Sequence, residues 1–168
     1  QYGVKVKWCV KGEGGIYSSP FKEDNRLFVG DDTGKLTAYN IKNGKRLWQF
    51  SVQRRIVGDC AAENGIVVFG SADSTVYGVS SANGKMIWKL KTQGPVLGAV
   101  RIVNGLAYIG ASDNKMRCID TKTGKEVWEY SGVTGYIVTR PLVTDGKVIF
   151  GAWDNTLYAL DASNGSEV

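Results

Sequence analysis

The chain repeats itself about every 40 residues, and this repeat constrains the fold more than any other feature. Four tryptophans recur at intervals of 40 residues: Trp8, Trp48, Trp88 and Trp128. Two glycine series keep nearly the same interval: Gly30, Gly70, Gly110 and Gly151, and then Gly44, Gly84, Gly124 and Gly165. Self-similarity at this period is typical of solenoids and propellers, in which each repeat is one small unit that must stack on its neighbours.

Each repeat contains four short extended segments separated by turn residues. In the second repeat the segments are expected at about 57–62, 66–70, 75–80 and 85–91. The first turn of three repeats has a strong hairpin signal, because both central residues of a type I′ turn need a positive φ. These pairs are Asn64-Gly65, Asn104-Gly105 and Asp145-Gly146. The second turn carries an aspartate that can accept hydrogen bonds from nearby backbone amides: Asp73, Asp113 and Asp154.

The second segment of the repeat is apolar on both faces, as residues 66–69 and 148–150 show. A strand with one face in water alternates between apolar and polar residues, so these strands are expected to be buried on both sides. Four-stranded antiparallel sheets stacked face to face meet that demand. The sequence therefore predicts an all-β chain, a β-propeller with blades at about 12–50, 51–90, 91–130 and 131–168.

The composition excludes several classes of function. The 168 residues include no histidine, so a Ser-His-Asp or Cys-His nucleophile cannot be built, and the commonest metal ligand is missing. The three cysteines (Cys9, Cys60 and Cys118) are far apart and form no CxxC pair. The net charge of +5 comes without a basic cluster interleaved with aromatics, so no nucleic-acid partner is expected. No apolar run is long enough for a transmembrane helix.

Two runs of the sequence resemble the repeat of the pyrroloquinoline-quinone (PQQ)-type β-propellers. They are Ile109-Gly110…Asp113…Ile119-Asp120…Gly124…Trp128 and Gly151…Asp154…Leu157-Tyr158-Ala159-Leu160-Asp161…Gly165. The resemblance implies that Trp8, Trp48, Trp88 and Trp128 are structural and dock between adjacent blades. It also implies a periplasmic or extracellular location. Members of the resembled family include quinoprotein dehydrogenases, cofactor-free binding scaffolds, and accessory domains of larger enzymes.

The expected strands are enough for four blades, but the fourth strand of one blade lies at the start of the sequence and the last repeat has only three strands. Residues 4–11 match the fourth strand of a repeat, while the fourth repeat stops at Val168, before its expected tryptophan. Propellers of the resembled family commonly have eight blades, so three arrangements remain open: a segment of a longer protein, two chains in one ring, or a four-bladed ring in which strand 4–11 completes the last blade. An open arc would expose two apolar faces, so we expect self-association through them rather than a stable open monomer.

The resemblance to dehydrogenases does not extend to their catalytic features. Those enzymes often carry adjacent cysteines beside the quinone and a calcium cluster, and neither is found in this sequence. Asp31 and Asp32 alone are weak evidence for a cation site. We therefore expect no catalytic residue, no metal ligand and no cofactor, PQQ and calcium being implied by the resemblance alone. The favoured function is a non-catalytic scaffold that binds protein or peptide. The alternative is a fragment of a quinoprotein dehydrogenase or an accessory domain of a larger enzyme.

Residues that break the repeat are the candidates for binding. At the position expected to line the mouth of the central channel the four copies read Ser19, Asp59, Ala99 and Arg140. At this position Asp59 and Arg140 either form a polar pair or are two solvated charges.

A second group of repeat-breaking residues falls in loops that are predicted to share one face. Trp153 is the only tryptophan outside the 40-residue series, and it either anchors a partner or packs locally against Tyr136 or Tyr17. Arg54 and Arg55 are the only adjacent basic pair in a loop, and their simplest reading is two solvated charges.

Overall fold

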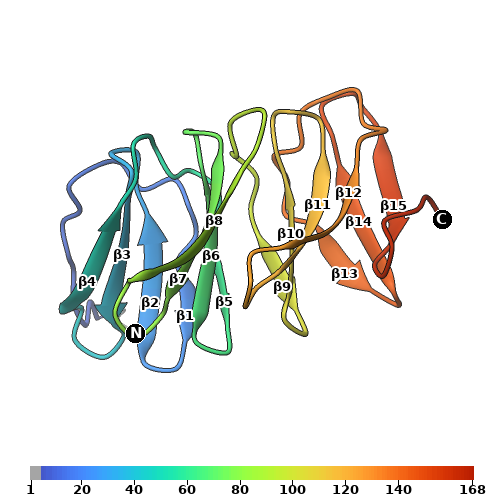
Figure 1. Cartoon of the computed structure of the whole chain (residues 1–168). Coiled ribbons are helices and arrows are strands. Elements are labelled where there is room, and N and C mark those ends of the chain that lie inside the picture. The colour runs from blue at the N-terminus through green and yellow to red at the C-terminus, as the bar shows by residue number, and fades with distance from the viewer. Residues whose placement is uncertain (1–4) are drawn as a thin grey trace.

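The structure, a computed structural model, describes residues 5–168 and builds them from fifteen β-strands (Figure 1). The prediction of an all-β propeller fold is therefore confirmed. In the described range there is no helix of the length and apolarity that a membrane crossing requires.

The strands form four antiparallel sheets, one for each repeat, in which strands adjacent in the chain are adjacent in the sheet. Blade 1 contains β1 (Phe21–Glu23), β2 (Arg26–Gly30), β3 (Lys35–Asn40) and β4 (Arg46–Ser51). Blade 2 contains β5 (Ala61–Glu63), β6 (Ile66–Ser71), β7 (Thr75–Ser80) and β8 (Met86–Lys91). Blade 3 contains β9 (Arg101–Val103), β10 (Leu106–Gly110), β11 (Met116–Asp120) and β12 (Glu126–Tyr130). Blade 4 has three strands: β13 (Leu142–Thr144), β14 (Lys147–Gly151) and β15 (Leu157–Asp161).

The blades stand side by side in a row, with blades 1 and 4 at its opposite ends (Figure 1). Three apolar layers fill the spaces between them. The layer between blades 1 and 2, for example, contains Phe28, Leu36 and Ala38 from blade 1 and Val67, Phe69 and Val79 from blade 2. Strand β6 is buried on both faces for this reason, as its sequence predicted. The core is thus the set of contacts between blades.

The first turns have the backbone conformation that their sequence predicted. Both residues of Asn64-Gly65 have a positive φ, 54° and 82°, and the same holds for Asn104-Gly105 and Asp145-Gly146. These pairs allow two-residue hairpins between the first and second strands.

Two strand predictions differ from the structure. The first strand of blade 2 was expected at 57–62, but β5 begins at Ala61. Here the inner edges of the blades crowd together: a Cβ on Gly58 would lie 2.3 Å from the carbonyl oxygen of Gly98. Residues 5–11 of the expected strand 4–11 form no strand, and residue 4 lies outside the described residues. Within the described part of the chain no strand pairs with this segment, and it does not complete blade 4.

Each repeated tryptophan docks on the following blade. Trp48 donates its indole N–H to the carbonyl of Ser81 at 3.0 Å, and its ring lies against Gly84, where a Cβ would come within 2.5 Å of the ring. The other three indoles repeat this arrangement: Trp8 with Ile41 and Gly44, Trp88 with Thr121 and Gly124, and Trp128 with Ala162 and Gly165. The second glycine series of the repeat therefore provides the flat surfaces on which the indoles lie.

We expect the change Trp88→Ala to lower the free energy of unfolding by about 3–5 kcal/mol, because it removes a buried aromatic side chain and leaves a cavity between blades 2 and 3. The matched control is Trp153→Ala, since Trp153 is exposed and lies outside the series; its effect should stay within about 0.5 kcal/mol. Urea unfolding followed by circular dichroism measures both. Equal losses in the two variants would contradict the structural role of the repeated indoles.

Candidate functional site

The loops that break the repeat share one face of the molecule, here called the linker face. In every blade a backbone hydrogen bond ties the linker before the first strand to the turn between the second and third strands. The four equivalent bonds are Asp32 to Gly15, Ala72 to Arg55, Ser112 to Pro95 and Trp153 to Tyr136, with lengths of 2.8–3.0 Å. Residues from distant parts of the sequence are thereby held in one row on a rigid support.

Trp153 and Tyr136 form an exposed aromatic pair on this face. Their ring centroids are 5.8 Å apart with an interplanar angle of 41°. Trp153 is nevertheless 68% exposed and Tyr136 48% exposed. Tyr136 is thus the aromatic neighbour of Trp153, whereas Tyr17 belongs to the linker of blade 1. Contact between the two rings restrains both side chains and leaves about two thirds of Trp153 and about half of Tyr136 accessible to a partner.

Arg54 and Arg55 are exposed in the linker between blades 1 and 2. They line a surface groove of about 430 Å³, whose remaining lining comes from Asp32, Ala72, Pro95 and Leu97. The groove therefore runs across the loops of three blades. Its lining combines two arginine cations and one carboxylate, that of Asp32, with an apolar wall of Ala72, Pro95 and Leu97. The positive charge exceeds the negative, which suits a chain segment with an acidic and an apolar side chain.

Asp59 and Arg140 form an ion pair at the inner position of the repeat. Arg140 Nη2 lies 3.0 Å from Asp59 Oδ2, although the residues belong to blades 2 and 4. The other carboxylate oxygen of Asp59 accepts a hydrogen bond from the backbone N–H of Ser19 in blade 1. The copy in blade 3 is Ala99, which has no polar side chain to join this pair. Asp59 therefore connects three of the four copies of this position.

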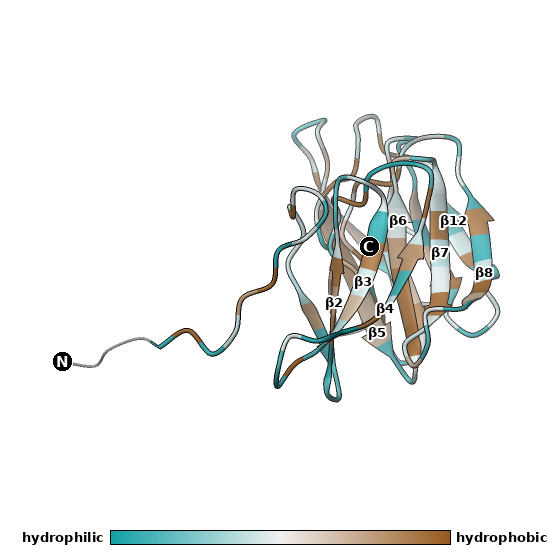
Figure 2. Ribbon diagram, turned by 90° about the vertical axis from the view of Figure 1, so that its left-hand side faces the viewer, coloured by the Kyte–Doolittle hydropathy of each residue, from teal (hydrophilic) through white to brown (hydrophobic). Residues whose placement is uncertain are grey.

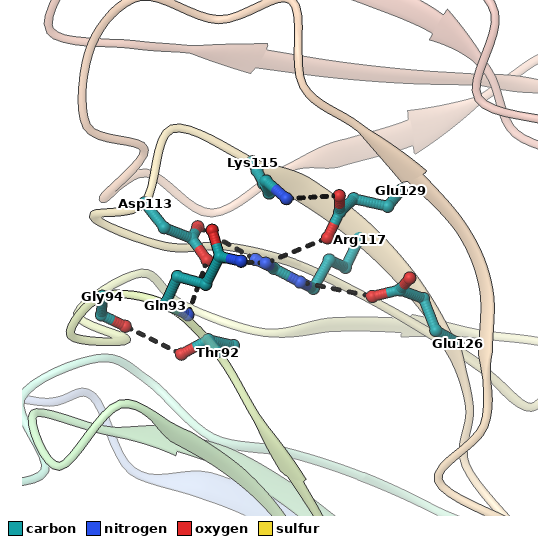
Figure 3. Close-up of polar contacts among 8 residues, drawn as sticks. All are labelled: Thr92, Gln93, Gly94, Asp113, Lys115, Arg117, Glu126 and Glu129. Carbon is teal, nitrogen blue, oxygen red and sulfur yellow. Dashed lines mark hydrogen bonds and ion pairs between the residues drawn. The ribbon is translucent and has the colours of Figure 1, made fainter.

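The structure also contains a buried charged cluster around Arg117 that sequence reasoning did not identify (Figure 3). The Arg117 guanidinium makes two hydrogen bonds to Asp113, of 3.0 and 2.6 Å. It also lies 3.3 Å from Glu126 and 3.1 Å from Glu129. Lys115 pairs with Glu129 at 2.7 Å on the outer side of the cluster.

The signal for this cluster was present in the repeat. The four copies of the position read Thr37, Tyr77, Arg117 and Tyr158. The tyrosine hydroxyls donate to the turn aspartate of their own blade, at 2.8 Å in blade 2 and 2.7 Å in blade 4. In blade 3 Arg117 replaces the tyrosine and donates to Asp113, so it stabilises the turn between the second and third strands. The cluster is accordingly structural.

Electrostatics in the cluster follow from burial and pairing. Burial alone would raise the pKa of Asp113, but the hydrogen bonds and positive charge of Arg117 outweigh it, and the pKa of this carboxyl is lowered. For Arg117 burial acts to lower the pKa, yet the carboxylates around it raise it above the ordinary value. Both groups are therefore charged at neutral pH.

The side chains present do not fit a quinone–calcium centre. Cys9, Cys60 and Cys118 are free and separate, and burial raises the pKa of Cys60 to about 12 and that of Cys118 to about 11. Across residues 5–168 no three His, Cys, Asp or Glu side chains gather as a metal site. The Asp31 carboxylate accepts hydrogen bonds from Thr33 and Lys35 in its turn, and Asp32 accepts one from Gly15. These carboxylates therefore stabilise the loops of blade 1.

Comparison with known proteins gives a family match over nearly the whole chain. The profile of the family described as outer membrane protein assembly factor BamB matches residues 5–131 and again residues 72–168. The outer membrane protein assembly factor BamB of Shewanella oneidensis is 34% identical over 77 residues, a match that covers 43% of this chain and 20% of that relative.

Solved structures show the same fold at lower identity. BamB from Moraxella catarrhalis superposes with a TM-score of 0.84 at 21% identity, over 93% of this chain and 49% of that chain. The computationally designed Ika4 protein gives 0.84 at 20% identity, over 95% of this chain and 98% of that chain. A quinohemoprotein alcohol dehydrogenase from Pseudomonas putida HK5 gives 0.78 at 17% identity, over 95% and 34%. This chain thus spans about half the length of the Moraxella protein, and these likenesses establish the fold alone.

The charged cluster gives a test of its structural role. We expect Arg117→Leu to lower the free energy of unfolding by about 3–5 kcal/mol at neutral pH, because Asp113 is left buried without its partner. Arg117→Tyr introduces the residue of blades 2 and 4 and should recover about 1.5–3 kcal/mol of that loss through a hydrogen bond to Asp113. Urea unfolding of the two variants measures both free energies of unfolding. Equal losses in the two variants would show that pairing with Asp113 does not contribute to stability.

The lowered pKa of Asp113 predicts how stability depends on pH. A carboxyl whose pKa is lower in the folded state than its unfolded value of about 3.9 adds stability above that value and loses it as pH falls through the folded pKa. The difference in stability between wild type and Asp113→Asn should therefore be constant near neutral pH and shrink below about pH 4. A difference that does not change with pH would contradict the assignment.

Proposed function

The chain belongs to the family of PQQ-type propellers described as outer membrane protein assembly factor BamB, and we propose that it is a non-catalytic scaffold that binds a protein partner through its linker face. The observation that carries the proposal is the aromatic pair of Trp153 and Tyr136. Both side chains break the repeat, neither docks a blade, and Trp153 remains 68% exposed and Tyr136 48% exposed.

The chemistry of the linker face suits recognition of protein. Tryptophan, tyrosine and arginine are the residues most often found at the energetic centres of protein interfaces. Here the aromatic pair lies on blade 4, and the groove beside Arg54 and Arg55 crosses the loops of blades 1 to 3. The fitting partner is a protein segment with an apolar or aromatic anchor and acidic residues.

The family suggests where such a partner acts. Its relatives are named for the assembly of outer membrane proteins, so we place this chain on the periplasmic side, within a larger protein or assembly that performs that task. The alternative, a fragment of a quinoprotein dehydrogenase or an accessory domain of a larger enzyme, is supported by likeness of fold alone.

Photocrosslinking in the source cells tests the proposal directly. A photoreactive phenylalanine analogue at position 153 or 136 should crosslink a specific protein. The same analogue at Ile87 should not, since Ile87 is a comparably exposed apolar residue on the outer strand β8, away from the linker face.

Affinity for the crosslinked protein is then measured with purified components. Trp153→Ala should weaken binding by about 30-fold, the effect of losing about 2 kcal/mol at an interface centre, and Ile87→Ala should leave it unchanged. Wild-type affinity in Trp153→Ala, or crosslinks from position 87 alone, would remove the linker face as the binding surface.

A further inference from the structure

A pocket of about 340 Å³ lies beside the outer strand of blade 2, between this blade and the linker from blade 1. It is called the blade 2 pocket here, and its lining residues are Gln53, Asp73, Thr75, Tyr77, Lys89 and Lys91. Thr75 lies opposite Lys91 and Tyr77 opposite Lys89, so the side chains of β7 and β8 in the lining share one face of the sheet. Figure 2 shows the hydrophilic residues of β8 between apolar ones.

The base of the pocket is held in place by aromatic contacts. The ring of Tyr77 stacks on Phe69 with the centroids 5.3 Å apart, and Phe50 of blade 1 meets the Tyr77 ring edge-on at 5.9 Å. The Tyr77 hydroxyl donates to Asp73 Oδ2 at 2.8 Å. Burial, and next the hydrogen bond to Asp73, raise the pKa of Tyr77 to about 12, so the hydroxyl remains a donor at neutral pH. One oxygen of the Asp73 carboxylate is therefore already paired.

The other oxygen, Asp73 Oδ1, is buried and has no hydrogen-bond partner in the described part of the chain. Both oxygens of the equivalent aspartate are bonded in blade 3, where Asp113 accepts from Arg117. The same is true in blade 4, where Asp154 accepts from Thr156 and Tyr158. A buried acceptor without a donor costs free energy, so a molecule that donates to Asp73 Oδ1 is favoured in this pocket.

Two lysines give the pocket a positive charge. Lys91 Nζ donates to the backbone carbonyl of Asp73 at 2.6 Å, which fixes its ammonium group beside the turn. Lys89 lines the pocket two residues earlier on β8, and the only carboxylate in the lining is that of Asp73. The lining therefore carries two positive charges and one negative charge, an excess that an acidic molecule can neutralise.

In blade 3 the chain itself supplies the charges that fill this space. The position of Tyr77 holds Arg117, and that of Lys89 holds Glu129. The Arg117 guanidinium lies 3.1 Å from Glu129 and bonds to Asp113, so each charged group there has a partner of opposite sign (Figure 3). Blade 2 keeps the aspartate, but it has a lysine in place of the glutamate and no guanidinium between them.

Blade 1 also balances its charges from within the chain. The equivalent space has about 220 Å³, and Glu13 of the linker pairs there with both Lys35 and Arg46. The copy of Glu13 in blade 2 is the neutral Gln53. Among these three blades, blade 2 thus combines the larger space with an excess of positive charge and an unpaired buried carboxylate oxygen.

From these observations we infer that the blade 2 pocket binds a small molecule with two carboxylates and one ammonium group, the chemistry of an acidic amino acid. The ammonium group donates to Asp73 Oδ1, and the carboxylates pair with Lys89 and Lys91. The two negative charges and one positive charge of the ligand then balance the lining. The volume is at the small end of the range for pockets that bind small molecules. The inference goes beyond the proposed function, because the aromatic pair of the linker face takes no part in this site.

Isothermal titration calorimetry of the full chain with L-glutamate tests the inference. One molecule should bind per chain, and NMR amide shifts should change around residues 73–77 and 89–91. Glutarate has both carboxylates without the ammonium group, so it should bind about tenfold or more weakly, the effect of losing a charged hydrogen bond. No binding of L-glutamate, or equal binding of the two molecules, overturns the inference.

Substitutions in the lining test which residues bind the ligand. Lys89→Gln and Asp73→Asn should each weaken binding of L-glutamate by about tenfold or more. The matched control is Lys85→Gln, which removes the same charge from an exposed residue in the turn at the other end of β7 and β8. It should leave the affinity unchanged. A loss in Lys85→Gln as large as that in Lys89→Gln would show a general effect of charge and overturn the assignment.

A double variant closes the pocket with groups that already fit the fold. Tyr77→Arg together with Lys89→Glu gives blade 2 the aspartate, arginine and glutamate of blade 3. Binding of L-glutamate should be lost, while circular dichroism shows that the blades are retained. Full binding in a folded double variant contradicts the proposed site, and the single variants decide the question if the double variant does not fold.

Discussion

The fold depends on one contact that is repeated at every boundary between blades: an indole that donates to a carbonyl of the next blade and lies on a glycine there. A single sheet of about 20 strand residues has no core of its own. Both faces of its central strands are apolar, so each face must be covered by another sheet. The indole joins two such sheets through a hydrogen bond and a close contact with a glycine. The side chains of β2, β6, β10 and β14 then bury one another, and the core exists only as a property of neighbouring blades.

Much of this could be predicted because the determinants are local and recur. Asn-Gly and Asp-Gly pairs specify the hairpins, two-sided apolar strands specify stacking, and the period of 40 residues specifies the unit. The strand at 4–11 was predicted from the same pattern, yet residues 5–11 form no strand, because a strand needs a neighbour to pair with and none of the described strands lies beside them. The late start of β5 has a similar cause: crowding at Gly58 and Gly98 arises when blades meet, and it leaves no local signal.

The candidate site was predictable only in part. Comparing the copies singled out Trp153, Arg140 and Asp59 as residues without a duty in the repeat, but the pairing of Asp59 with Arg140 across a blade needed the curvature of the row. Arg117 was overlooked although the same comparison shows it: its position holds tyrosine in two other blades. The role of Arg117 follows from its equivalents in the other blades. Tyr77 donates to the turn aspartate of blade 2, and Arg117 makes the same hydrogen bond in blade 3.

The same comparison separates the two kinds of surface that the chain exposes. The outer faces of blades 1 and 4 carry residues at repeat positions that are buried between blades elsewhere, such as Leu27 and Val29 of blade 1 and Leu157 of blade 4. The linker face carries residues that depart from it, an aromatic pair and a groove with two arginines, held on loops that the backbone bonds keep in place. A blade docking at an end buries repeat positions and leaves these loops untouched. A protein bound on the loops likewise needs none of the end residues. Stacking of blades and binding on the linker face therefore involve different residues, so a change in one set of residues can be tested without disturbing the other.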